Sequence, residues 1–274
     1  MFILCSYIKE EDWSYILKTY HDDSKHLEIA KKVYEMIINI YNALKLKRSS
    51  IIFNSMICFH KYYIYNLYSN KAILNNSLLE YIAVACFFSG TKSSDFKIRV
   101  DDILNYSYKC NILNQKTHDE NRDKILYYEF EILNVMQFNI TNYGLTYKNA
   151  YFVLENIYKL LKIEFKDNSV SEKIKEYFIA QIRYSFVFPF FLNYDKKTII
   201  LSCINLLLKQ LFPNYIITLW DNKEYINIKS DIIQCSKLFE QFLNEKKENN
   251  DNKNDKEINI GIIRKINSTN TNSV

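Results

Sequence analysis

Residues that could carry chemistry are present, but their spacing does not match a known catalytic or metal-binding motif. The histidines are His21, His26, His60 and His118, and the cysteines are Cys5, Cys58, Cys86, Cys110, Cys203 and Cys235. No histidine lies at ligand spacing from a cysteine or aspartate, and no CxxC occurs. The glycines are isolated from one another, so no glycine-rich phosphate loop can form. We therefore expect no enzyme activity, no catalytic residue, no metal and no cofactor.

Adjacent carboxylates occur at Glu10-Glu11 and at Asp101-Asp102. A catalytic pair is one interpretation of this spacing. The helix dipole also stabilises acidic residues in the first turn of a helix, and this structural interpretation outweighs the catalytic one. We therefore expect both pairs to be ordinary charges near helix termini.

One further carboxylate falls where an apolar side chain is expected. In a predicted helix over 119–137, Glu129 lies at helical spacing among Ile125, Tyr128, Ile132, Leu133 and Met136. An unpaired buried carboxylate is costly, so Glu129 either reaches water at the edge of this stripe or has a partner. Lys92, just after an apolar helix, is either a helix-end cation or a binding residue. The sequence by itself leaves both questions open.

The elements that position these residues are predicted to be helices. The 274 residues are 48% hydrophobic, with only 3 glycines and 2 prolines. A β-sandwich or barrel needs a turn signal about every 8–12 residues, so this composition disfavours one. Periodicity predicts helices over 8–20, 24–46, 49–67, 76–91, 100–109, 119–137, 146–163, 171–188, 195–212 and 229–244. Gly90 is the expected stop of helix 76–91.

The chain divides into two similar halves. Each half has one helix almost without charge, at 78–89 and at 198–208, and such a helix forms the buried centre of a bundle. Gly144 and its polar neighbours mark the boundary. The predicted parts are an amino-terminal helix in 1–23, a first repeat over 24–141, a second repeat over 142–245 and a disordered polar tail over 246–274.

Composition also limits the setting of the protein. Most cysteines lie in apolar runs, which is typical of reduced thiols inside a cell. The opening MFILCSYIKEEDW is too short an apolar stretch for a signal peptide, and no charge-free run exceeds 16 residues (132–147), short of a membrane span. The formal net charge of +5 is spread along the chain rather than gathered in a stripe. We expect a soluble intracellular protein.

Four segments resemble the cyclin box in sequence and order. ACFFSGTKSSDFKIRVDDIL (85–104) is similar to the stretch in which a buried Ala-Cys helix ends in Gly-Lys before acidic residues and a short helix. EFEILNVMQFNI (129–140) is similar to the later helix that carries a glutamate before its apolar pairs. CFHKYYIY (58–65) resembles the Phe-His-Arg-Phe-Tyr element of transcription-associated cyclins of the K, T, L, C and H types, and 180–207 resembles the second repeat. The resemblance implies the cyclin fold, an all-α fold of two tandem five-helix repeats.

The resemblance also implies roles for individual residues. Lys92 and Glu129 match the lysine and glutamate with which cyclins bond backbone groups of the kinase beside its αC helix. The neighbouring kinase-binding surface is expected to consist of Phe88, Phe96, Ile98 and, from the amino-terminal helix, Trp13. The apolar substrate-docking patch of cell-cycle cyclins is not evident in KKVYEMIINI (31–40).

The implied function is that of a non-catalytic regulatory subunit that forms a heterodimer with a cyclin-dependent serine/threonine kinase and activates it. Transcription in the nucleus is the expected context, with the cell cycle and the cytoplasm as further settings. We expect no membrane, nucleic acid or small-molecule partner. Two alternatives stay open: a TFIIB-type transcription factor that binds DNA with the same helical repeat, and a helical scaffold that activates no kinase.

Overall fold

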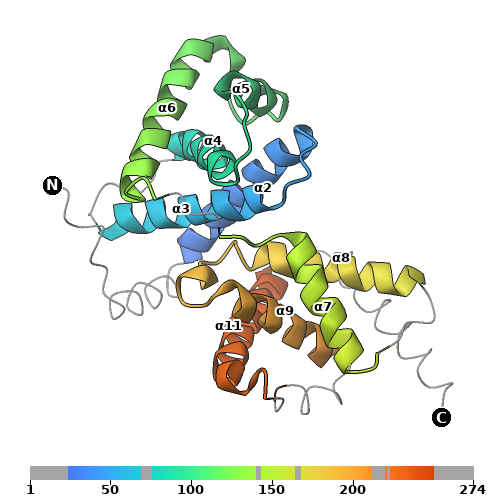
Figure 1. The fold of residues 1–274 in the computed structure, drawn as a ribbon. Helices are drawn as coiled ribbons and strands as arrows, with labels where there is room; N and C mark the ends of the chain where they lie inside the picture. The colour runs from blue at the N-terminus through green and yellow to red at the C-terminus, as the bar shows by residue number, and fades with distance from the viewer. Residues whose placement is uncertain are drawn as a thin grey trace. The chain divides into compact units, whose positions relative to one another are not determined.

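The computed structural model describes residues 24–68, 76–139, 143–163, 168–211, 220 and 223–249 (Figure 1). These residues form nine α-helices and three short 3₁₀-helices, η1 (Gln115–Thr117), η2 (Phe190–Leu192) and η4 (Ile226–Ile228), with no strand among them, which confirms the predicted all-α class. The predicted helix over 8–20, including Trp13, and residues 250–274 lie outside the described part of the chain.

Two compact units make up the chain. The first comprises Met1–Thr146 together with Phe186–Asn193, and the second comprises Tyr147–Ser185 and Tyr194–Val274. The segment Phe186–Asn193, which the sequence suggested for the second repeat, packs within the first unit. There the carbonyl oxygen of Phe186 accepts a hydrogen bond from Nε2 of His60, at 2.9 Å. A contact between residues so far apart in sequence gives no periodic signal.

The first unit is built around one central helix. Its helices are α2 (Ser24–Ala43), α3 (Ser50–Tyr68), α4 (Asn76–Ser93), α5 (Val100–Lys109) and α6 (His118–Val135). The α4 helix packs against all four of the others (Figure 1). Because its middle carries no charge, every residue from Ile82 to Phe87 can be fully buried without an unpaired ion.

Gly90 does not end α4, so the predicted stop at this residue is wrong. The helix continues to Ser93. A Cβ atom added to Gly90 would lie 2.1 Å from Oγ and 2.8 Å from the backbone nitrogen of Ser55. The glycine is therefore needed for the close approach of α3 to α4 rather than for a left-handed turn.

The helices end at left-handed residues other than glycine. Positive φ angles of 51–54° occur just after α2, α4, α5 and α7 at Lys45, Asp95, Asn111 and Lys162. After α2, the N–H of Leu46 bonds to the carbonyl of Tyr41 at 3.2 Å, and after α4 the N–H of Phe96 bonds to that of Thr91 at 2.9 Å. These are Schellman motifs, which satisfy the last carbonyls of a helix. The same hydrogen bonds fix the backbone positions of Leu46 and Phe96.

The second unit also has a buried central helix. Its described helices are α7 (Tyr147–Leu160), α8 (Asn168–Tyr184), α9 (Lys196–Leu211) and α11 (Lys229–Asn249). The α9 helix contacts the other three, and Ser202 and Cys203 at its middle are buried, as the charge-free pattern predicts. The α11 helix extends to Asn249, four residues into the predicted tail over 246–274.

Candidate protein-binding site

Lys92 and Glu129 meet at the surface of the first unit. Lys92 is in the last turn of α4 and Glu129 is on α6, and the packing of these two helices brings Nζ of Lys92 to 2.5 Å from Oε1 of Glu129. The lysine side chain is 45% exposed, whereas the glutamate side chain is only 7% exposed. The packing of α4 on α6 thus joins two side chains that lie 37 positions apart in sequence.

The burial of Glu129 answers the question that the sequence left open. It lies on the buried face of α6 between Ile125 and Ile132, both of which are fully buried. Glu129 is thus not at a wet edge of the stripe, and Lys92 supplies the counter-charge that a buried carboxylate requires. The partner of Glu129 in this structure belongs to the chain itself.

The ion pair retains hydrogen-bonding capacity. Oε1 of Glu129 lies close to the ammonium group of Lys92 but accepts no hydrogen bond of normal geometry in the described part of the chain. The ammonium group also lies 4.2 Å from the centre of the Phe88 ring. A carboxylate has about four acceptor positions and an ammonium group three donors. The exposed ammonium group of Lys92 can therefore bind further acceptors, whereas Oε1 of Glu129 is buried from solvent.

The other residues predicted to bind the partner differ in how far they are exposed. Phe88 is buried and forms the floor beneath Lys92 rather than an exposed contact. Phe96 and Ile98 are partly exposed and line an open groove of about 940 Å³ that has Lys92 at its edge. Trp13 lies outside the described residues.

Among the exposed aromatic residues that the sequence analysis did not single out, Phe130 and Phe138 lie close to each other. Phe130 on α6 is 55% exposed and Phe138, just after that helix, is 59% exposed. Their ring centres lie 6.2 Å apart. Large apolar side chains that cluster at a surface are typical of interaction sites. The signal was available, because Phe130 lies off the apolar stripe of its helix and so had to face solvent.

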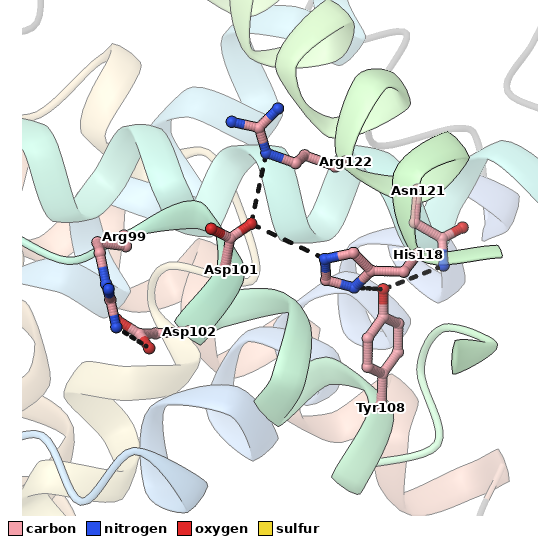
Figure 2. A network of polar contacts seen from close by, with 7 residues as sticks. All are labelled: Arg99, Asp101, Asp102, Tyr108, His118, Asn121 and Arg122. Carbon is pink, nitrogen blue, oxygen red and sulfur yellow. Dashed lines mark hydrogen bonds and ion pairs between the residues drawn. The ribbon is translucent and has the colours of Figure 1, made fainter. Parts of the chain in front are cut away.

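Asp101 and Asp102 are in the first turn of α5, as predicted, and face different cations. Figure 2 shows Asp102 paired with Arg99, at 3.1 Å from Nε, while Asp101 faces Arg122 and His118 of α6. The distances from Oδ1 of Asp101 are 3.4 Å to Nε of Arg122 and 3.9 Å to Nε2 of His118. Each carboxylate is thus held by its own partners, and the two do not form a pair.

A network of polar contacts joins α5 to α6 beside Asp101. The hydroxyl group of Tyr108 lies 3.0 Å from Nδ1 of His118 and accepts a hydrogen bond from Nδ2 of Asn121 at 3.4 Å (Figure 2). Asn121 is fully buried and also donates to the carbonyl of Asn114 at 2.7 Å. Because a buried amide is costly unless bonded, this network fixes α5 against the amino-terminal end of α6.

No protein-family model matches the chain, and no curated protein matches it significantly. Within the described ranges, no group of three or more His, Cys, Asp or Glu side chains is placed to hold a metal ion. None of the helices described is both long and apolar enough to cross a membrane.

Proposed function

We propose that this chain is a cyclin-type regulatory subunit that binds a cyclin-dependent serine/threonine kinase and activates it, with transcription in the nucleus as its context. The observation that carries the proposal is the Lys92–Glu129 pair, a buried carboxylate and a half-exposed lysine at 2.5 Å. Lys92 and Glu129 are the two residues that the resemblance to cyclins matches with the family's kinase-binding lysine and glutamate.

The pair suits the recognition of backbone groups. In the free protein each charge compensates the other, so the buried carboxylate is tolerated without a partner protein. On binding, a kinase carbonyl can accept from the exposed Lys92, and a kinase N–H would have to donate to Oε2 of Glu129, because Oε1 is buried. Exposed Phe130 and Phe138 would supply apolar contact area beside these polar bonds.

Activation requires that the chain prefer one kinase conformation. A protein kinase is active when its αC glutamate pairs with its β3 lysine, so a cyclin must bind the state with αC turned inward. Moving a kinase from about 1% to 99% active takes roughly 5.5 kcal/mol of differential affinity. Discrimination between two kinase states requires a surface that keeps its shape, and the packing of α4 against four helices supports such a surface.

No observation favours the DNA-binding alternative. A TFIIB-type factor would need a concentrated basic face on the second unit. Exposed lysines are present there, among them Lys148, Lys159 and Lys196, so the DNA arm of the experiment below tests this alternative. The scaffold alternative predicts binding without activation, which the experiment below distinguishes.

The test uses the full chain and a panel of purified cyclin-dependent kinases from the transcriptional and cell-cycle classes. Affinity is measured by interferometry, and activity is measured on a peptide of the RNA polymerase II tail repeat, with and without the chain. We expect at least one kinase to bind and to gain activity. Binding without activation would support the scaffold, whereas binding of duplex DNA but of no kinase would support the transcription-factor alternative.

A further inference from the structure

A groove in the first unit runs between two connecting segments. One wall is the connection between α2 and α3, with Leu44 and Leu46, and the other is the connection between α4 and α5, with Phe96 and Ile98. Tyr106 of α5 adds a further aromatic surface. The groove is open and has a volume of about 940 Å³, which is large enough for several side chains.

One wall presents backbone groups as well as side chains. Residues 96–99 form no helix, and Arg99 has the extended angles φ −80° and ψ 147°. In an extended segment alternate side chains share a face, which agrees with Phe96 and Ile98 both lining the groove. Lys97 and Ile98 make no backbone hydrogen bond within the described chain. Adjacent residues of an extended segment direct their N–H and C=O groups to opposite edges, so one of the two can pair with a single added strand.

The two walls are tied together in the free protein. Nη1 of Arg48 donates to the carbonyl oxygens of Ser94 and of Asp95, the second at 3.0 Å. Nδ2 of the buried Asn54 donates to Oγ of Ser94 at 2.9 Å. These bonds fasten the start of one wall to the other wall and to α3. A groove held open in this way costs a ligand little reorganisation.

The charges around the groove favour an acidic occupant. Its lining includes Lys97, Arg99 and Asp102, and the last two neutralise each other at 3.1 Å. Lys97 is exposed and makes no ion pair in the described structure, and the opposite connection carries the exposed Lys45 and Lys47. Asp95 is the one remaining carboxylate of the described lining. Along the α4–α5 connection Lys97 and Arg99 are matched by Asp95 and Asp102, so the excess of cations beside the groove comes from the α2–α3 connection.

We propose that this groove binds an extended peptide whose alternate apolar side chains enter it, whose backbone pairs with the segment 96–99, and whose flanking residues are acidic. The groove shares Lys92, Phe96 and Ile98 with the surface that the resemblance assigns to the kinase, so a bound kinase would compete with the peptide. The proposal itself does not require kinase binding, because the peptide is tested on the free chain. The groove would serve as a docking surface for a substrate or regulator segment of this composition.

The test measures fluorescence anisotropy of a labelled peptide, Glu-Glu-Asp-Leu-Asp-Phe-Glu-Asp-Glu, titrated with the full chain. Two control peptides have Lys at every acidic position, or Ala in place of Leu and Phe. We expect only the first peptide to bind, with hydrogen exchange slowed at residues 96–99. Equal binding of all three peptides, no binding of the first, or unchanged exchange at 96–99 would overturn the proposal.

Variants locate the binding site on the protein. Ile98→Asp should weaken the acidic peptide at least about tenfold, because a charge in an apolar contact is desolvated without a partner. Lys97→Glu alters an exposed side chain and should leave the fold intact, so it tests the groove even if Ile98→Asp unfolds the protein. It should weaken peptide binding and lower the salt dependence of that binding. If Lys97→Glu binds as well as the unaltered chain, the groove is not the site. That outcome leaves kinase binding through Lys92 and Glu129 unaffected.

Discussion

Gly90→Ala is the sharpest test of how α4 is held. The added methyl group would lie 2.1 Å from Oγ of Ser55, 2.8 Å from its backbone nitrogen and 2.9 Å from the carbonyl oxygen of Ile51. Two of these three atoms are backbone, so rotating a side chain cannot relieve the clash and α3 must move. Overpacking of this kind costs typically about 1–3 kcal/mol. The better helix propensity of alanine returns only about 1 kcal/mol.

We therefore expect Gly90→Ala to lower the free energy of unfolding by up to about 2 kcal/mol, measured by urea denaturation followed by circular dichroism. Adding Ser55→Ala removes the hydroxyl contact but not the two backbone contacts, so it should restore only part of the loss. A Gly90→Ala chain that is more stable than the original would refute the close packing of α3 on α4.

Two further predictions concern stability. Burial lowers the pKa of His60 to about 4, while the unfolded state keeps about 6.5, so only the unfolded state gains a proton as pH falls from about 6.5 to 4. The free energy of unfolding, measured by urea denaturation, should decrease over that pH range, and His60 should account for roughly 3 kcal/mol of the decrease. A free energy of unfolding that does not change with pH would contradict the burial of His60 as a neutral ring. Lys162→Gly should stabilise the second unit by about 0.5–1 kcal/mol, because φ is 54° at this position and glycine adopts that angle without strain. As the control, Glu155→Gly within α7 should destabilise the unit by about 1 kcal/mol. Equal effects of the two substitutions in thermal melts would contradict the left-handed conformation of Lys162.

The positions of the helices could be predicted because local sequence determines them. An uncharged run long enough for several turns has to be buried, which identified α4 and α9 as central helices before any contact was known. Helix ends were less predictable. The expected signal is glycine, yet the left-handed residues just after α2 and α4 are Lys45 and Asp95, and the glycine near the end of α4 serves packing instead.

The site could be predicted only in part. The position of Glu129 on an apolar stripe indicated that it needs a partner, but spacing could not identify one located 37 positions away on another helix. The groove could not be predicted from the sequence for the same reason, because the hydrogen bonds from Arg48 to Ser94 and Asp95 join segments that share no periodic pattern. Tertiary contacts of this kind depend on how helices pack, which local patterns do not encode.

The central claim is that Lys92 and Glu129 together hold a kinase. The most direct measurement is the affinity of a partner kinase for the unaltered chain, for Lys92→Ala, for Glu129→Gln and for the double variant, with circular dichroism melts of each. Lys124→Ala, which breaks an exposed ion pair with Glu120 on the same α6 helix, is the matched control.

Each single substitution at the site should cost roughly 2–5 kcal/mol of binding, or about thirty- to several-thousand-fold in affinity, because a kinase backbone group is left desolvated and unpaired. The double variant should cost less than the sum of the two, since the side chains are in contact, and Lys124→Ala should change affinity by less than about threefold. Kinase affinity unchanged in both single variants, or lost only in step with thermal stability, would show that the pair is a structural ion pair and not a kinase-binding site.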